Sequence, residues 1–282
     1  MNALVTGAGG LVGGVLADRL EALGIAVVRA GRRARAPDWL AWDMAAGPPR
    51  PARRFQCVVH TAPLWVLPGH LEHLAGSGAT RVIGFSSTSV VTKRASAGRI
   101  DRTLAGALQE AERQVRRESE RLGLCTTLFR PTMIYGYGRD RNVTAIAGFI
   151  RRWGFFPVAG KGSGRRQPVH VDDVAQAAVS VLNNPVSCGR TYDLTGGETL
   201  SYRRMVERIF EALGKRPRIV AVPTAAYRCL LTAAGLLGAR LTADVADRMN
   251  QDMVFDSHDA RVDLSFVPQG FLQHPERDLA AA

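Results

Sequence analysis

Three glycines near the N-terminus constrain the fold of this chain more than any other feature. Gly7, Gly10 and Gly13 stand between a short apolar segment and a helical pattern of apolar residues. In such a unit the first glycine permits a tight turn, the second lets the backbone approach a pyrophosphate, and the third lets the helix pack closely on the strand. The start of the helix, at Leu11 and Val12, then offers free N–H groups to phosphates. The spacing predicts a strand, turn and helix that bind a nucleotide.

Apolar segments and helical patterns alternate through the first half of the chain. Strands alternating with helices of this length indicate βαβ units and a parallel sheet covered on both faces. We therefore predict an α/β fold, a Rossmann-type doubly wound parallel sheet with a small, mostly helical C-terminal lobe on the substrate side. The predicted strands are 2–6, 25–29, 57–60, 81–85 and 126–129, and the predicted helices are 11–23 and 102–122.

The rhythm changes after about residue 135. Helices are expected over 142–153 and 201–213, short strands over 169–171 and 191–194, and a basic loop over 154–167. The expected division is a NAD(P)-binding Rossmann domain of residues 1–134 and about 168–195, intertwined with a substrate-side lobe of about 135–167 and 196–282.

Composition and charge narrow the class of protein. The 282 residues are 46% hydrophobic and 22% charged, which excludes a disordered or collagen-like chain. The net charge of +12 first allows nucleic acid, an anionic membrane or a polyphosphate ligand as partner. Residues 29–54 hold seven arginines against two acids, and residues 151–166 hold five basic residues and no acid. With no nucleic-acid motif, this distribution favours two small phosphorylated ligands, the cofactor and the substrate.

Several classes of site have no support in the sequence. The four cysteines are far apart and form no CxxC, and the six histidines have no HxxxH or HxH spacing. This spacing suggests neither a metal site nor a disulfide framework, so a cytoplasmic location is expected. The longest apolar stretch, 219–241, is interrupted by Pro223 and two arginines. It predicts a buried helix rather than a stable membrane span, with peripheral membrane contact as the alternative.

The residues after the second strand predict which dinucleotide binds. NAD-binding proteins usually place an acid there to bond the ribose hydroxyls, whereas this chain has Arg32 and Arg33 and no acid until Asp38. Arginine pairs with a 2′-phosphate that an acid would repel. NADP(H) is therefore the expected cofactor, and NAD is the second choice. Asp43 is also expected to be a cofactor-binding residue. The alternative is that these arginines simply face water.

A family resemblance covers nearly the whole chain. The chain resembles the extended and atypical short-chain dehydrogenase/reductases, the NAD-dependent epimerase/dehydratase group that acts on nucleotide sugars and related substrates. The motifs that carry the resemblance are TGAGGLVG at 6–13, FSSTS at 85–89, RPTMIYG at 130–136, RQPVHVDDVA at 166–175, YDLTGG at 192–197 and DARVDLSF at 259–266.

The chain departs from this family at the catalytic motif. Members usually carry Tyr-x-x-x-Lys on the helix after the fifth strand, and none of the five tyrosines here has a lysine four residues on. If Glu112 matches the glutamate that often follows the motif, Leu104 and Leu108 take the Tyr and Lys positions, and leucine has no proton to exchange. In lacking this motif, the chain resembles the atypical members of the family. Some of those are reductases with other acids, and others are binding proteins, such as the accessory NADPH-binding subunit of respiratory complex I.

Other side chains are candidates for chemistry. Ser87 and Thr88 match the position of the family hydroxyl that hydrogen-bonds the substrate; the alternative is that they merely cap the end of a strand. Lys93, in the loop just beyond, could act as an acid or base if it is desolvated. Tyr135 could be a proton donor or a core residue. The substrate-side candidates are Asn142, Arg166, which resembles a diphosphate-binding arginine, and His170, for which a structural hydrogen bond is the alternative.

Two functions remain open from the sequence. The first is an NAD(P)-dependent oxidoreductase or epimerase-like enzyme acting on a nucleotide-linked sugar or similar carbonyl compound. The second is a non-catalytic NADP(H)-binding sensor or assembly protein, which the missing Tyr and Lys favour. A homodimer through the helix at 102–122 is possible.

Overall fold

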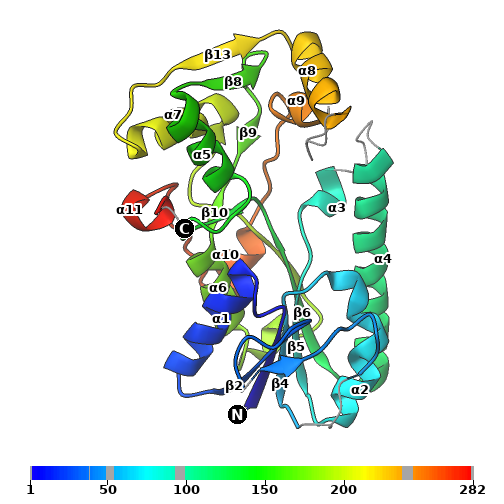
Figure 1. Ribbon diagram of the computed structural model, residues 1–282. Coiled ribbons are helices and arrows are strands. Elements are labelled where there is room, and N and C mark those ends of the chain that lie inside the picture. Colours follow the sequence, from blue (N-terminus) through cyan, green and yellow to red (C-terminus); the bar gives the residue numbers. More distant parts are fainter. Residues whose placement is uncertain (1, 38, 49–53, 93–98, 237–243, 281–282) are drawn as a thin grey trace.

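A seven-stranded parallel sheet forms the centre of the computed structural model, which describes residues 2–37, 39–48, 54–92, 99–236 and 244–280 (Figure 1). The strand order is β11-β6-β5-β4-β1-β2-β3. The strands are β1 (Asn2–Thr6), β2 (Ala26–Gly31), β3 (Leu40–Ala41), β4 (Cys57–His60), β5 (Arg81–Phe85), β6 (Cys125–Pro131) and β11 (Thr191–Leu194). The predicted α/β class and the parallel sheet are confirmed.

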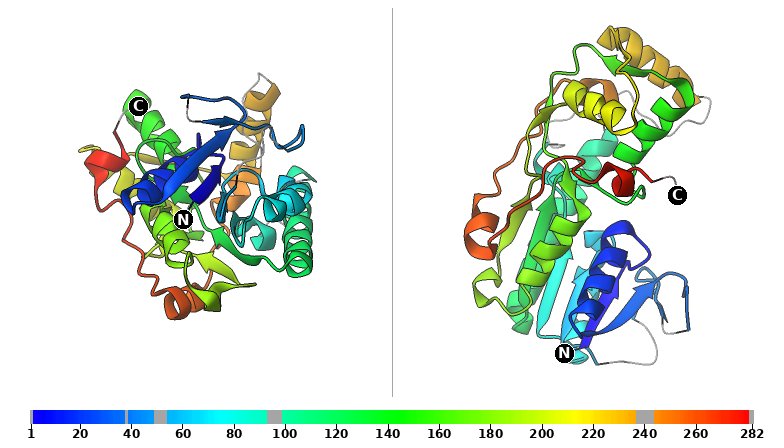
Figure 2. Two further views of the ribbon diagram at one scale, coloured as in Figure 1. Left: turned by 90° about the horizontal axis from the view of Figure 1, so that it is seen from below. Right: turned by 90° about the vertical axis from the view of Figure 1, so that its left-hand side faces the viewer.

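Helices cover both faces of this sheet, as its uninterrupted apolar strands require. On one face, α1 (Leu11–Ala22), α6 (Val171–Ser180) and α10 (His258–Leu264) enclose a core with β1, β4 and β11. On the other face lie α2 (Leu71–Gly76), α4 (Arg99–Leu122) and the 3-10 turns η1 (Leu64–Val66) and η2 (Pro68–His70). Figure 2 shows the two layers on either side of the strands.

A second core lies beyond the carboxyl ends of the strands, in the upper part of Figure 1. Its helices are α5 (Val143–Trp153), α7 (Tyr202–Ala212), α8 (Thr224–Leu236), α9 (Asp244–Arg248) and α11 (Pro275–Asp278). Two-stranded sheets β7 (Ile134–Tyr135) with β10 (Val169–His170), β8 (Phe156–Ala159) with β13 (Ile219–Val222), and β9 (Arg165–Arg166) with β12 (Leu200–Ser201) complete it. The remaining short elements are α3 (Ser89–Thr92) and η3 (Pro185–Ser187).

Two sequence expectations for this part of the chain are wrong. The segment 154–167 is not only a loop, because β8 and β9 lie within it and pair with segments more than thirty residues away. The apolar stretch 219–241 begins as β13 and continues as α8, a surface helix on which Leu230 is 63% exposed. Pairing between distant segments and the choice of a helix's buried face are both set by tertiary contacts, which periodicity does not reveal.

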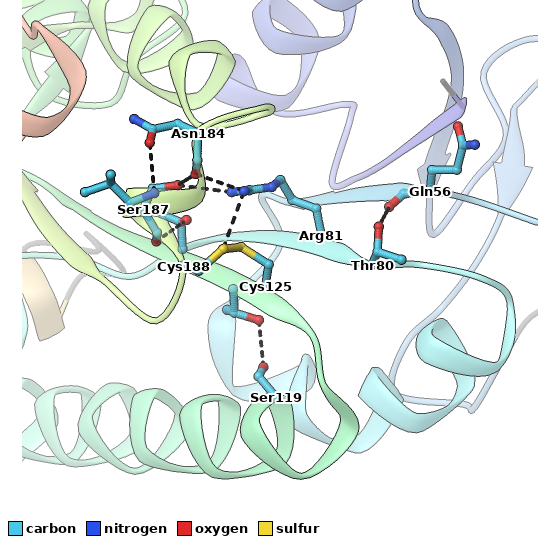
Figure 3. Close-up of a disulfide and its surroundings, with 11 residues drawn as sticks. Gln56, Thr80, Arg81, Ser119, Cys125, Asn184, Ser187 and Cys188 are labelled. Carbon is cyan, nitrogen blue, oxygen red and sulfur yellow. Dashed lines mark hydrogen bonds between the residues drawn. A yellow bond between two sulfur atoms is a disulfide. The ribbon is translucent and has the colours of Figure 1, made fainter.

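The cysteines also correct the sequence analysis. Cys125 and Cys188 form a disulfide with Cα atoms 4.8 Å apart, although 63 positions separate them in the sequence. They meet because β6 and β11 are neighbours in the sheet, which the cysteine spacing could not show. Figure 3 shows Arg81 beside this disulfide, with Nη2 3.0 Å from the Asn184 carbonyl and 3.6 Å from Cys188 Sγ.

Candidate dinucleotide and substrate site

The glycine turn lies where the strand order of the sheet reverses, between β1 and β4. In open α/β sheets, ligands bind in the crevice outside the carboxyl ends of the strands at this point. Gly7 has a φ of +72°, and a Cβ there would lie 2.7 Å from the Ala62 nitrogen. A Cβ at Gly13 would lie 2.5 Å from both the Gly7 oxygen and Thr61 Oγ1. The turn and the close packing of α1 therefore both require glycine.

The start of α1 is open to an anion. Gly10 is the N-cap residue, and its N–H closes the turn on the Gly7 carbonyl at 2.9 Å. It provides no capping side chain, and the first helical turn, which begins with Leu11 and Val12, carries no acid. The backbone N–H groups and the positive end of the helix dipole are therefore left for a ligand such as a pyrophosphate. That Gly10 lets such a group approach stays a prediction.

Arginines surround this turn, and two of them, Arg35 and Arg139, were not predicted from the sequence. Arg32 and Arg33 follow β2 directly and are exposed. Arg35 folds back onto the turn, because a Cβ built on Gly9 would lie 3.0 Å from the Arg35 Cζ. On the other side, Arg139 Nη1 lies 3.7 Å from the position of a Cβ on Gly14. Arg35 belongs to the same basic run as its two predicted neighbours, so its charge was visible in the sequence and its direction was not.

The predicted cofactor residue Asp43 lies just after β3. Its side chain is exposed, and Oδ1 accepts a hydrogen bond from the Ala45 N–H at 3.1 Å. The Asp43 carbonyl accepts a second bond from the Ala46 N–H at 2.9 Å. The carboxylate thus holds the turn after β3, and its contact with a cofactor stays a prediction.

Four hydroxyl side chains follow β5 at the carboxyl edge of the sheet. Ser87 Oγ donates to Ser89 Oγ at 3.0 Å, and the Thr88 hydroxyl donates to the Pro131 carbonyl at 3.3 Å. Ser86 Oγ is buried and has no hydrogen-bond partner among the described residues. The structure thus places both predicted hydroxyls at the sheet edge and adds Ser86. Lys93 lies outside the described residues.

The positions expected for the Tyr and Lys of the family motif are part of the apolar core. Leu108 is 6% exposed, and Leu104 packs against the same cluster beneath α4. One turn further on, Glu112 accepts two hydrogen bonds from Arg130, at 2.8 Å from Nε and a second from Nη2. The hydrogen bonds that Arg130 donates to Glu112 raise the pKa of the arginine. This pair ties α4 to β6 and keeps the two leucines facing the sheet.

Tyr135 is fully buried in β7. Its hydroxyl donates to the Gly270 carbonyl at 3.2 Å and accepts from the Leu272 N–H at 3.0 Å. Burial raises the pKa of this phenol above its ordinary value. The hydroxyl both donates to and accepts from the backbone. Of the two roles predicted for Tyr135, this geometry fits a core residue rather than a proton donor.

His170 is also fully buried and joins two elements. Its Nδ1 accepts from the Asp172 N–H at 3.1 Å, which caps α6, and its Nε2 lies 2.9 Å from Asp278 Oδ1. Burial works to raise the pKa of Asp278, but the hydrogen bond from His170 and the charge of Arg277 outweigh it and lower the pKa. Both ring nitrogens therefore hold the protein together, as the structural alternative for His170 expects.

The two remaining substrate candidates lie in different environments. Asn142 is exposed at the N-cap of α5 and makes no side-chain cap, which Asp140 supplies instead through its bond from the Val143 N–H at 2.6 Å. Arg166 is 4% exposed, and its guanidinium donates to the carbonyls of Arg165, Arg248 and Gln251. Burial lowers the pKa of Arg166 to about 10. Asn142 is free to meet a ligand, whereas Arg166 clamps backbone.

A network near the C-terminus escaped sequence reasoning. Arg277 lies over the Tyr137 ring at 4.9 Å and pairs with Asp172 at 3.2 Å, and the Tyr137 hydroxyl donates to the same carboxylate at 2.9 Å. Arg277 is more than a hundred residues away from both partners in the sequence, so no local pattern reveals these contacts. Within the described residues, no group of three or more His, Cys, Asp or Glu side chains is placed to hold a metal ion, and no helix is long and apolar enough to cross a membrane.

The sheet order, the glycine turn at its switch point and the covering helices define a doubly wound fold of the Rossmann type. Residues 71–194 match the NAD dependent epimerase/dehydratase family. This part of the chain is therefore similar to that family, as the motifs indicated.

Individual proteins show the same relationship. Over 98 residues, 34% of this chain and 24% of the relative, the chain is 34% identical to the mitochondrial NADH dehydrogenase [ubiquinone] 1 alpha subcomplex subunit 9 of Arabidopsis thaliana. It is 29% identical over 245 residues to the uncharacterized oxidoreductase YesF of Bacillus subtilis, covering 83% of this chain and 78% of the relative. A crystal structure of UDP-glucuronic acid 4-epimerase from Bacillus cereus with UDP-glucuronic acid and NAD superposes with a TM-score of 0.77 and 15% identity, over 99% of this chain and 98% of that one.

Proposed function

We propose that the chain binds a nicotinamide dinucleotide at the turn between β1 and α1. The observation that carries this proposal is the geometry at Gly7 and Gly13, where side chains have no room, beside a helix start without a cap or an acid. This is the arrangement that brings backbone N–H groups against a pyrophosphate. The family match and the NAD in the Bacillus cereus epimerase structure support the proposal.

NADP(H) is the proposed form of the cofactor, with NAD as the second choice. Arg32 and Arg33 are exposed directly after β2, where a 2′-phosphate would lie. Arg35 covers Gly9, in the part of the turn that would face the pyrophosphate of a bound dinucleotide. We therefore assign the 2′-phosphate to the first two arginines and the diphosphate to Arg35.

The proposed activity is that of an oxidoreductase or epimerase-like enzyme on a nucleotide-linked sugar or similar carbonyl compound. The bound cofactor would supply or accept hydride. The chain's own contribution at the sheet edge would come from Ser86, Ser87 and Thr88, and their proposed role is to polarise a substrate oxygen once it displaces their present hydrogen-bond partners. Asn142 and Arg139, both exposed, are the proposed contacts to a phosphorylated substrate.

A second candidate function rests on a different observation. If Glu112 matches the family's glutamate, Leu104 and Leu108 take the positions of the proton-transferring residues, and both leucines pack in the apolar core. The Thr88 hydroxyl also donates a hydrogen bond to the backbone carbonyl of Pro131. A protein that keeps NADP(H) as a structural or regulatory ligand, without turnover, would need none of these groups to be reactive.

Binding by variants followed by turnover tests both candidates. Arg32→Ala with Arg33→Ala is expected to weaken NADPH by about ten- to a hundred-fold and leave NADH nearly unchanged, because only NADPH carries the 2′-phosphate. Arg35→Ala is expected to weaken both dinucleotides by a similar factor. Equal losses of NADPH and NADH in the Arg32 and Arg33 variant would refute the assignment of the 2′-phosphate.

Hydride transfer then separates the enzyme from the binding protein. The protein loaded with NADPH or NADP is incubated with nucleotide sugars and small carbonyl compounds, and absorbance at the nicotinamide band is followed. An epimerase returns the hydride to its substrate, so product sugars are also separated by chromatography. Turnover on any substrate supports the enzyme, and tight binding without turnover supports the second candidate.

Other features stay proposals. The division into a dinucleotide-binding domain and a substrate-side lobe, and a homodimer through α4, follow from the sequence and the family resemblance. A cytoplasmic location is proposed on the same basis. The Cys125–Cys188 disulfide argues against it, because disulfides persist mainly in oxidising compartments.

A further inference from the structure

Exposed aromatic and basic side chains gather at the end of the upper lobe. This group, the lobe-tip patch, consists of Arg152, Trp153 and Phe155 at the end of α5 and Lys215, Arg216 and Arg218 before β13. In Figures 1 and 2 this end of α5 and β13 lie in the part of the molecule farthest from the N-terminus, away from α1 and the glycine turn. The patch is therefore separate from the proposed dinucleotide site.

Backbone contacts hold the two segments of the patch side by side. The helix α5 ends at Gly154, whose φ of +72° turns the chain sharply, and the Phe156 N–H donates to the Arg218 carbonyl at 2.9 Å. Lys215 Nζ donates to the carbonyls of Ile150 and Arg151 at 3.4 and 3.3 Å. The lysine thus binds the last turn of α5, and the patch is built on ordered backbone.

The aromatic side chains of the patch are exposed at a fixed position. Trp153 is 57% exposed and Phe155 is 37% exposed. Both pack on one side against Phe149, with ring centroids 6.4 and 5.7 Å from it. Large aromatic side chains held at the surface in this way mark an interaction site more than scattered aliphatic residues do.

The charge around these rings has a single sign. The Arg152 guanidinium lies 5.2 Å above the Trp153 ring, and the other basic residues are exposed. Among the described residues, no carboxylate lies within ion-pair distance of the four basic side chains of the patch. Glu211, the acid that precedes the second segment, is paired with Arg204 at 2.7 Å.

We propose that the lobe-tip patch docks on a lipid bilayer with anionic headgroups. Tryptophan and phenylalanine favour the interface between headgroups and acyl chains, and arginines and lysines beside them attract anionic lipids. A protein partner would call for a groove or a larger apolar face, and a nucleic acid for a basic stripe along a groove. The patch instead combines two exposed aromatic rings with four cations at the end of the lobe. Peripheral attachment of this kind needs no membrane-crossing helix.

Vesicle binding measures this directly. The protein is expected to sediment with phosphatidylcholine vesicles that contain phosphatidylglycerol and not with phosphatidylcholine alone, and the binding should weaken as salt is added. Arg152→Glu with Arg216→Glu should lower the partition coefficient by about thirty-fold or more, since each basic residue near an anionic surface contributes about a factor of five. Brominated lipid should quench tryptophan fluorescence in the wild type, and Trp153→Phe should remove that quenching.

A matched control distinguishes the effect of the lobe-tip patch from the effect of the protein's net charge. Arg113→Glu with Arg117→Glu on α4 changes the net charge by the same amount, from +12 to +8, at two exposed positions outside the patch. This control should keep vesicle binding within a factor of about three. No binding to anionic vesicles, an equal loss in the control, or binding to a duplex DNA fragment that competes with the vesicles would overturn the proposal. A melting curve for each variant confirms that it is folded.

Discussion

Two adjacent glycines in α1 offer the sharpest test of how the turn is built. A Cβ on Gly13 would lie 2.5 Å from the Gly7 carbonyl oxygen and 2.9 Å from the Ala8 Cα. A Cβ on Gly14 would lie no closer than 3.5 Å to the Ala8 oxygen, which is ordinary contact. The pair therefore gives a perturbation and its control one residue apart in the same helix.

The expected magnitudes follow from these distances. For Gly13→Ala, the new Cβ must move from 2.5 Å to at least the 3.0–3.4 Å of tight real contacts, and two of the three nearest atoms, the Gly7 oxygen and the Ala8 Cα, are backbone that cannot rotate aside. Such overpacking costs about 1–3 kcal/mol beyond the gain of up to ~1 kcal/mol from replacing a helical glycine. Gly14→Ala meets no such obstacle and should stabilise the protein by about 0.5–1 kcal/mol.

Thermal unfolding and NADPH titration measure the effects of the two substitutions. At about 2–4 °C per kcal/mol for a chain of this size, Gly13→Ala should melt several degrees below the wild type and Gly14→Ala slightly above it. NADPH affinity should fall for Gly13→Ala, because the turn that presents the N–H groups is displaced, and stay unchanged for Gly14→Ala. Equal stability and equal affinity in the two variants would refute the account of the turn.

Three further changes test the framework around the site. Glu112→Ala removes the buried carboxylate partner of the partly exposed Arg130 and should cost up to about 3 kcal/mol in urea unfolding, whereas Glu110→Ala in an exposed pair of the same helix should cost far less; equal losses would contradict the role of the Glu112–Arg130 pair. Reducing the disulfide should cost up to about 4 kcal/mol for a loop of 63 residues, and Cys125→Ser with Cys188→Ser should melt at the same temperature with or without reductant. Burial lowers the pKa of His60 to about 4, so the buried neutral imidazole contributes its full stability above pH ~6.5, and the free energy of unfolding falls by about 3 kcal/mol at most as the pH drops toward 4. His60→Gln should flatten this dependence of the free energy of unfolding on pH, measured by unfolding curves across that range.

The strands and long helices of the sheet could be predicted from the sequence because their signals are local. The segment Cys57–His60 is a continuous apolar run that is buried on both faces, and Ser201 caps α7 through a bond from the Arg204 N–H at 3.1 Å. The glycine turn belongs with these. Its strand and helix stand within one βαβ unit, and the steric demand at Gly13 comes from its own neighbourhood.

What the sequence did not reveal depends on contacts between distant residues. The basic run at 151–166 was expected to lie together at the substrate cleft, but Arg166 is buried against backbone and Arg165 pairs with Asp252. Arg152 lies at the lobe tip over Trp153. Residue type and spacing predict that charge is present in a segment, whereas the direction of a long side chain is decided by the groups that fold against it.

Equilibrium titration of the wild-type protein with NADPH and NADH tests the central claim most directly. Energy transfer from tryptophan to the reduced nicotinamide, or calorimetry, gives both dissociation constants in one buffer. The account predicts saturable binding of one dinucleotide per chain, tighter for NADPH than for NADH. Failure of both dinucleotides to bind would contradict the assignment of the turn between β1 and α1, and with it both candidate functions.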